Sequence, residues 1–275
     1  MTRSAVKGQI AGAIVPFVSV ILRCRPWSLA FAVALASCVN FHPLQKTPAK
    51  ASAKADATAA VEPAWKVIGH SVQGRPLRVA SYGSGPRRVL WVGGIHGNER
   101  EGVVSTASLP AAFLAADREN KVTLTILEDV NPDGTAAKQR GNANGVDLNR
   151  NFPTRNFQPH RFFGMKPLSQ PESLALHDLI LSLKPHLVIV AHSWSGDHFI
   201  NFDGPARYLA QRFADLSGYP VRDSGDMAAT PGSLGNWAGI ENGIPVLTLE
   251  HLRGREPNAA WSDTQKAILA VVLDA

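Results

Sequence analysis

Short apolar runs alternate with longer segments of helical spacing along most of this 275-residue chain. The runs have the length and the flanking turn residues of buried β-strands, and they predict strands at 77–82, 88–92, 122–127, 187–191 and 245–249. The segments with helical spacing predict helices at 102–116, 171–183, 205–216 and 257–273. This alternation predicts an α/β fold, a single domain with a central mixed, mostly parallel sheet flanked by helices.

Two of the predicted connections are informative, one a short turn and the other a long loop. The turn Gly83-Ser84-Gly85-Pro86 joins the first two predicted strands, so we expect these strands to be neighbours in the sheet. Residues 131–153 show no regular period and are rich in Asn, Asp, Gly and Arg. Because long ordered loops in compact domains are commonly functional, we expect this one to contribute to a site.

The beginning of the chain is typical of a targeting segment. Arg23 and Arg25 precede an apolar run at 27–37 that is too short to span a bilayer and has the length of a signal-peptide core. The run ends in Leu35-Ala36-Ser37-Cys38, which resembles the lipobox of bacterial lipoproteins, where cleavage precedes a lipidated cysteine. The alternatives are a membrane anchor, or a chance cysteine after an ordinary signal peptide.

The expected domain organisation follows from this leader. Residues 1–37 are interpreted as a signal peptide of the lipoprotein type, and 38–62 as the lipidated Cys38 with a flexible tether rich in Ala, Thr, Ser and Lys. Residues 63–275 are expected to form the folded domain. The protein is therefore expected to be exported and anchored in a membrane of the bacterial envelope, with its domain facing the periplasm.

The formal net charge of +6 comes largely from the leader. Residues 1–37 hold four basic residues and no acidic one, so 24 basic and 22 acidic residues remain after them. This near balance gives no reason to expect nucleic acid as a partner. The two cysteines, Cys24 and Cys38, both precede the expected domain, which excludes a disulfide scaffold or a cysteine zinc site within it.

Candidate metal ligands follow the predicted strands. His96 and Glu99 follow a strand that ends in Gly93-Gly94, where glycine permits a tight loop, and His192 and Glu250 follow two other strands. Ligands of open α/β sheets bind beyond the carboxyl ends of the strands, so these side chains could meet in one place. His96, Glu99 and His192 would then form a zinc set with an open fourth position. Glu250 could take the proton from a bound water.

Three segments together resemble the zinc metallocarboxypeptidase family, the carboxypeptidase A-like group. They are His96-Gly97-Asn98-Glu99, the run from Asn131-Pro132-Asp133-Gly134 through Gly145-Val146-Asp147-Leu148-Asn149-Arg150-Asn151-Phe152-Pro153, and Leu247-Thr248-Leu249-Glu250. With His192 they extend over most of residues 65–255. The middle segment is the most specific, because so many fixed positions recur in order.

The resemblance implies a role for each matching residue. His96, Glu99 and His192 would bind one Zn²⁺ ion, and Glu250 would be the general base. Arg140 would polarise the scissile carbonyl and stabilise the oxyanion, a contribution of a few kcal/mol. Asn149 and Arg150 would hold the free carboxylate of the released residue, for which a guanidinium offers a bidentate fork.

One departure from the family bears on the substrate. Family carboxypeptidases carry a mobile tyrosine before the general base, and the chain has no tyrosine between Tyr219 and Glu250. Its Gly69–Leu77 segment and Pro231-Gly232-Ser233 are more similar to the murein peptide amidase branch, whose members hydrolyse the bond between γ-D-glutamate and meso-diaminopimelate. The resemblance thus implies a small peptide substrate derived from peptidoglycan, and we expect a monomer.

Two other functions are weighed against this one. An aspartoacylase or succinylglutamate desuccinylase-like deacylase shares an HxxE start, but the Asn131–Gly134 element and the Asn149-Arg150 pair favour the peptidase. A lipid-anchored protein that binds muropeptides without cutting them would have no need of Arg140 and Glu250 beside a metal.

Overall fold

The computed structural model describes residues 64–274. The predicted signal peptide at 1–37, the predicted lipidation site Cys38 and the tether at 38–62 lie outside the described residues, as does Pro63. Within the described part of the chain, no helix is both long enough and apolar enough to cross a membrane.

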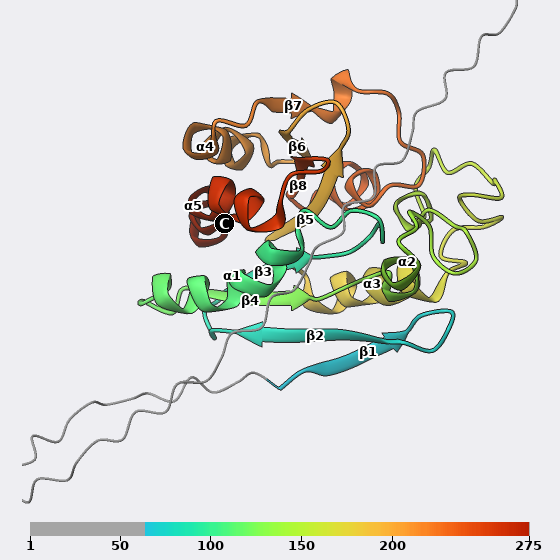
Figure 1. Cartoon of the computed structure of the whole chain (residues 1–275), viewed down its shortest axis with the longest axis horizontal. Helices are drawn as coiled ribbons and strands as arrows, with labels where there is room; N and C mark the ends of the chain where they lie inside the picture. The colour runs from blue at the N-terminus through green and yellow to red at the C-terminus, as the bar shows by residue number, and fades with distance from the viewer. Residues whose placement is uncertain (1–63, 275) are drawn as a thin grey trace, which may run out of the picture. The chain divides into compact units, whose positions relative to one another are not determined.

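Eight strands form one sheet in the order β1-β2-β4-β3-β5-β8-β6-β7, with β1 and β2 at one edge and β7 at the other (Figure 1). The central strands β4, β3, β5 and β8 run parallel, as do β6 and β7, while β1 with β2, β2 with β4, and β6 with β8 pair antiparallel. Their bounds are β1 Lys66–His70, β2 Pro76–Tyr82, β3 Arg87–Val92, β4 Val122–Leu127, β5 Leu187–Trp194, β6 Phe199–Asp203, β7 Val221–Asp223 and β8 Val246–Leu252. The predicted mixed, mostly parallel sheet is confirmed.

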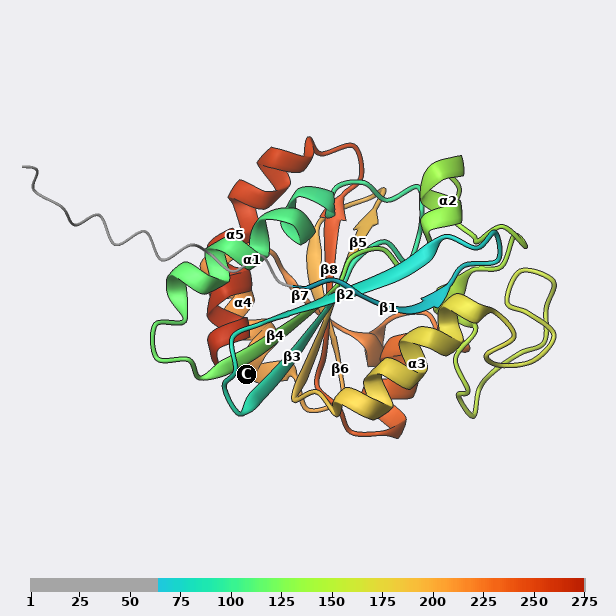
Figure 2. The ribbon, with the colours of Figure 1, turned by 90° about the horizontal axis from the view of Figure 1, so that it is seen from below.

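Helices cover both faces of this sheet (Figure 2). One face packs against α1, α4 and α5, and the other against α3 and a π-helical segment, Gly235–Glu241. The helix bounds are α1 Val103–Ala116, α2 Pro132–Ala137, α3 Pro171–Leu183, α4 Arg207–Ser217 and α5 Pro257–Asp274.

Burial on both faces explains why the central strands are largely apolar. In β3, Val89 and Trp91 belong to the core under α1 and α5, while Leu90 and Val92 belong to the core under α3. All four side chains are fully buried. Alternate residues of a strand point to opposite faces, so a strand between two helical layers needs apolar residues at every position.

Two sequence predictions about connections need correction. β2 and β3 are not neighbours, because β4 lies between them and pairs with both. The turn at 83–86 therefore joins strands that lie two positions apart. The expected loop at 131–153 holds the short helix α2 and a 3₁₀ turn, Leu148–Arg150. Asn131 begins α2 by accepting a hydrogen bond from Gly134 N with its side chain at 2.9 Å, the usual N-cap role of Asn.

Candidate metal centre and active site

The parallel strands β3, β5 and β8 bring the candidate residues together at the carboxyl ends of the central strands. β5 and β8 are adjacent, and their register sets His192 directly beside Glu250. Both residues lie within their strands, which continue to Trp194 and Leu252, whereas the sequence placed them just after the strands. Neighbouring residues in register point to the same face, so both side chains reach the same cleft.

A tight loop after β3 presents the other two candidates. Gly94 has a φ of 67°, a conformation that glycine adopts without strain. A Cβ atom on Gly97 would lie 1.9 Å from the carbonyl carbon of Gly134, so only glycine allows the loop to pack this closely against α2. The loop thereby buries His96 and directs it, with Glu99, toward β5.

His96, Glu99 and His192 converge. His96 Nδ1 lies 2.9 Å from Glu99 Oε1, and His192 Nδ1 lies 2.8 Å from Glu99 Oε2. The three candidate ligand atoms all lie within 4.8 Å of one another, and the two imidazole centroids are 4.6 Å apart. Two imidazole nitrogens and a carboxylate at such separations are a donor set that fits zinc.

Asp147 orients the first of these histidines. Its Oδ1 lies 3.0 Å from His96 Nε2 and also accepts a hydrogen bond from Asn149 N at 2.9 Å. A carboxylate on the outer nitrogen fixes the tautomer in which Nε2 carries the proton and Nδ1 is free to bind a metal.

The charges of this cluster perturb one another. Burial by itself raises the pKa of Glu99, but the charges and hydrogen bonds of His192 and His96 outweigh it and hold the pKa far below its ordinary range. Burial lowers the pKa of His96, but its hydrogen bonds to Asp147 and Glu99 outweigh this and raise it. Glu99 is therefore a permanent carboxylate at neutral pH, as a metal ligand must be.

Glu250 has the properties of a proton acceptor. Burial raises the pKa of its carboxyl group, with a further contribution from the charge of Glu99. Its Oε2 atom is buried and has no hydrogen-bond partner among the described residues. A carboxylate that is harder to keep ionised is a stronger base, and an unpaired oxygen can accept a proton from a reactant.

Three further predicted residues line the same cleft. Arg140 donates to Glu99 Oε1 at 3.1 Å and to Asp147 Oδ2 at 2.9 Å, and its side chain is half exposed. Arg150 Nη1 donates to the carbonyl oxygen of Asn149 at 2.7 Å. Asn149 accepts a hydrogen bond from Leu234 N at 2.9 Å, which fixes the side chain. All the predicted site residues of the described chain therefore meet around one cleft, whose cavity has a volume of about 120 Å³.

The cleft also contains an acid that the sequence did not single out. Asp203, at the end of β6, lines it with His192 and Glu250 and is 8% exposed. A Cβ on Gly235 would lie 2.2 Å from Asp203 Oδ2, so the glycine makes room for this carboxylate. Burial raises the pKa of Asp203, against a hydrogen bond from Ser224 that lowers it. No sequence motif marks this position, and β6 was not predicted as a strand.

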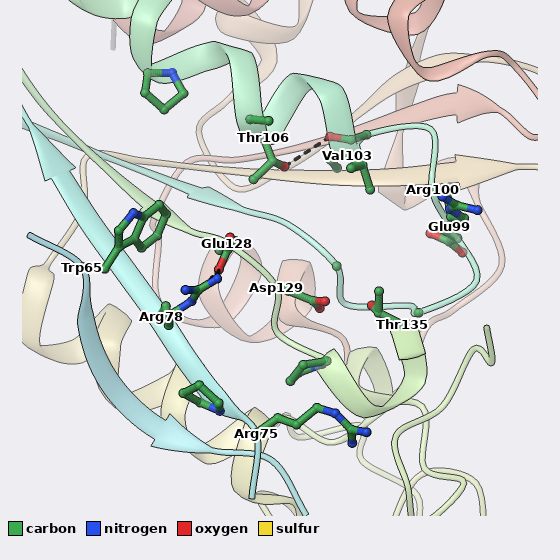
Figure 3. A pocket seen from close by; sticks show the side chains of 18 of the residues that line it. Trp65, Arg75, Arg78, Glu99, Arg100, Val103, Thr106, Glu128, Asp129 and Thr135 are labelled. Atoms are coloured by element: carbon green, nitrogen blue, oxygen red, sulfur yellow. Dashed lines mark hydrogen bonds and ion pairs between the residues drawn. The ribbon is translucent and has the colours of Figure 1, made fainter. Parts of the chain in front are cut away.

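A larger cavity of about 900 Å³ lies between α1 and the strands β2 and β4 (Figure 3). It shares Glu99 with the smaller cleft, but Glu250, His192 and Arg150 do not line it. Its walls are mixed, with apolar side chains from α1 and the charged groups Arg75, Arg78 and Glu128. Most of the predicted site residues therefore belong to the smaller cleft.

Asp129 lies at the side of this larger cavity near Thr135 (Figure 3). Burial raises its pKa from 3.8 to about 6, although hydrogen bonds from Thr135 and Asn131 N oppose this. The folded state thus binds the proton more tightly than the unfolded state. The stabilisation from protonated Asp129 is present below about pH 4 and is lost as the pH rises through 6.

We expect Asp129→Asn to remove this pH dependence. Relative to the wild type, the free energy of unfolding of the variant should increase by up to about 3 kcal/mol between pH 4 and pH 7. Urea unfolding at a series of pH values measures the difference. Parallel stability curves for the two proteins would show that Asp129 titrates normally.

Comparison with known proteins identifies relatives that agree with a zinc site in this cleft. A model of the zinc carboxypeptidase family matches residues 56–225. The chain is 33% identical to murein peptide amidase A of Escherichia coli K12 over 217 residues, which covers 70% of this chain and 82% of that protein. It is 27% identical over 219 residues to γ-D-glutamyl-L-diamino acid endopeptidase 1 of Lysinibacillus sphaericus, covering 58% and 54% of the two chains.

A solved structure shares the fold. The murein-tripeptide amidase of Escherichia coli O157 superposes with a TM-score of 0.66 at 26% identity, covering 78% of this chain and 94% of that one. The family model ends before β8, so the place of Glu250 beside His192 rests on the sheet register rather than on the matched segment.

Proposed function

The chain belongs to the zinc carboxypeptidase family and is a peptidase or amidase, and from this premise we propose that its substrate is a small cell-wall peptide. The bond cleaved would be the one between γ-D-glutamate and meso-diaminopimelate, next to a free carboxylate. The observation that carries the proposal is the convergence of the His96, Glu99 and His192 cluster with Glu250 and Arg150 on one cleft. The names of the relatives, which state murein peptides and diamino acids, support it.

The cofactor we propose is one zinc ion held by His96 Nδ1, His192 Nδ1 and the Glu99 carboxylate. The donor types and their separations of 2.8 and 2.9 Å fit such an ion. Zinc, when bound, supplies a Lewis acid for the scissile carbonyl and lowers the pKa of water to about 7.

The protein residues would perform the remaining steps. Glu250 accepts the proton of the attacking water and returns it to the leaving amine. Arg140, half exposed at the rim, turns from Glu99 to the carbonyl oxygen of the substrate as negative charge grows there. Arg150 and Asn149 hold the free carboxylate of the leaving residue, which selects peptides cut next to a terminal acid.

The position of Asp203 is evidence that the leaving residue of the substrate has a cationic side chain. The neighbouring acids Asp197 and Asp223 pair with Arg222 at 3.2 Å and Arg207 at 2.5 Å. Asp203 makes no salt bridge with any residue that the structure describes, although its carboxylate is almost fully buried. A buried carboxylate without a cation is costly, and an ammonium group of the substrate would compensate it. The distal amine of diaminopimelate is such a group.

Asp203→Asn should lower kcat/KM by about 10- to 100-fold for a peptide that ends in diaminopimelate, because a hydrogen bond to a charged group is worth about 1.5–3 kcal/mol. The same substitution should change kcat/KM little when the last residue is norleucine, which has no distal amine. Steady-state kinetics with both peptides measures the difference. Equal losses for the two peptides would contradict charge recognition.

The proposed reaction is tested directly with the zinc-loaded protein. It is incubated with L-Ala-γ-D-Glu-meso-diaminopimelate and, separately, with peptides that end in ordinary α-linked residues, and the products are identified by mass. We expect free diaminopimelate from the first substrate and no release from the others. Release from the ordinary peptides alone would favour a general carboxypeptidase, and hydrolysis of an N-acyl amino acid, assayed in parallel, but of neither peptide would favour the deacylase.

We also infer attachment to the bacterial envelope through Cys38, as an exported lipoprotein with its domain facing the periplasm. The support is the apolar run at 27–37 followed by Leu35-Ala36-Ser37-Cys38. Such an anchor would keep the enzyme beside peptidoglycan peptides.

A further inference from the structure

Arg253 connects three segments of the candidate metal centre. It follows β8, the strand of Glu250, and its Nη2 donates to Glu99 Oε1 at 2.9 Å. The same nitrogen donates to the carbonyl oxygen of Ser193 at 3.0 Å, and Nη1 lies 3.4 Å from that of Asn98. A single guanidinium thus joins the loop after β3, the end of β5 and the end of β8.

We propose that Arg253 is a positioning residue that holds the Glu99 carboxylate toward the two histidines and thereby sets the zinc affinity. The inference rests on the proposed function, in which Glu99 is a ligand. Oε1 and Oε2 of Glu99 must face His96 and His192 at the same time, which fixes the rotation of the carboxylate about its last bond. Arg253 holds Oε1, and Ser193 N holds Oε2 with a hydrogen bond of 3.1 Å.

Arg140 cannot replace Arg253 in this role. Arg140 also donates to Glu99 Oε1, but its other partner is the carboxylate of Asp147, and its side chain is 46% exposed. In the proposed reaction it turns to the substrate, so its bond to Glu99 is not permanent. Arg253 is 33% exposed and is tied to two backbone carbonyls, which keep it in place when substrate binds.

Arg253 acts through Glu99 rather than on the substrate. The residues that line the catalytic cleft include Arg140 and Arg150 but not Arg253. Groups that orient a metal ligand typically change metal affinity or activity by about 10- to 100-fold when they are removed. If Arg253 only held the strand ends together, its removal would change the stability of the fold but not the zinc affinity. The two roles can therefore be separated by measurement.

The test measures zinc affinity of the full chain by competition with a chelating dye. Arg253→Met should weaken zinc binding by about 10- to 100-fold. Arg253→Lys should lie between this variant and the wild type, because an ammonium keeps the charge but not the planar fork. Arg255→Met is the matched control, since Arg255 pairs with Asp263 at 2.8 Å on the surface, and its zinc affinity should stay within about twofold of wild type.

Urea unfolding of the metal-free proteins completes the test. Unchanged zinc affinity in Arg253→Lys and Arg253→Met, with or without a lower free energy of unfolding, would overturn the positioning role. If Arg253→Met does not fold, Arg253→Lys decides alone, and weaker zinc binding with unchanged metal-free stability supports the proposal. Failure of the wild type to bind zinc would overturn the proposed metal centre and this inference together, whereas zinc binding that depends on His192 but not on Arg253 would overturn the inference only.

Discussion

Replacing Glu250 with glutamine is expected to lower kcat by about 10²–10⁴-fold, the usual contribution of a positioned general base. Glutamine has nearly the same shape as glutamate but cannot accept a proton. Because Glu250 is not one of the three proposed ligands, zinc content should remain at one ion per chain. Turnover of the murein tripeptide and metal analysis of the same preparation measure the two quantities.

A surface substitution provides the control for this variant. Glu119→Gln removes a carboxylate whose side chain is 72% exposed and pairs with Lys121, which is also on the surface. Its kcat should equal that of the wild type. Equal turnover of Glu250→Gln and wild type would refute the assigned base, and loss of zinc from Glu250→Gln would show that Glu250 acts on the metal instead.

Replacing His192 with alanine is expected to remove both zinc and activity. The variant loses one of three converging ligands, and the proposed Lewis acid contributes several kcal/mol to the barrier, so activity should fall by roughly 10³-fold or more. Dialysis of the wild type against a chelator should produce the same loss, and added zinc should restore activity to the wild type but not to the variant. Metal analysis and turnover assays follow both effects.

His198 supplies the matched control for the ligand. It lies six residues after His192 in the sequence, is 41% exposed and contacts Asp197 and Tyr219 rather than the cluster. His198→Ala should keep one zinc ion per chain and its turnover. Loss of zinc from His198→Ala, with zinc retained in His192→Ala, would show that His198 and not His192 is the ligand.

The strands that hold the site could be predicted from the sequence because they are buried on both faces. β3, β4, β5 and β8 lie at the centre of the sheet. β3 and β5 contain unbroken apolar runs, and in β4 and β8 threonine alternates with large apolar residues. β1, β6 and β7 escaped prediction. β1 has only two large apolar residues, Val67 and Ile68, β6 holds Asn201 and Asp203 among its apolar residues, and β7 has three residues. Strands this short or this polar resemble loops in sequence.

The order of the strands was the main error about the fold. A short turn between two runs suggests neighbours, yet β4 lies between β2 and β3. β4 reaches that place after α1, whose Leu109 and Phe113 pack on the sheet with Trp91 of β3. Which strands pair is decided by long-range packing of this kind, and turn chemistry reports only on residues close together in the chain.

The sequence by itself determined the α/β class, the apolar central strands and the candidate residues His96, Glu99, His192 and Glu250, since each depends on local residue patterns. His96 and Glu99 are three residues apart, and His192 and Glu250 each follow an apolar run. The tertiary structure alone decided that these side chains meet, that Asp203 lines their cleft without a salt bridge to any described residue, and that Arg253 holds Glu99. Arg253 and Glu99 are 154 positions apart. The physical reason is that hydrogen bonds, burial and charge act through distances in space, which exist only once the sheet has brought the ends of separate strands together.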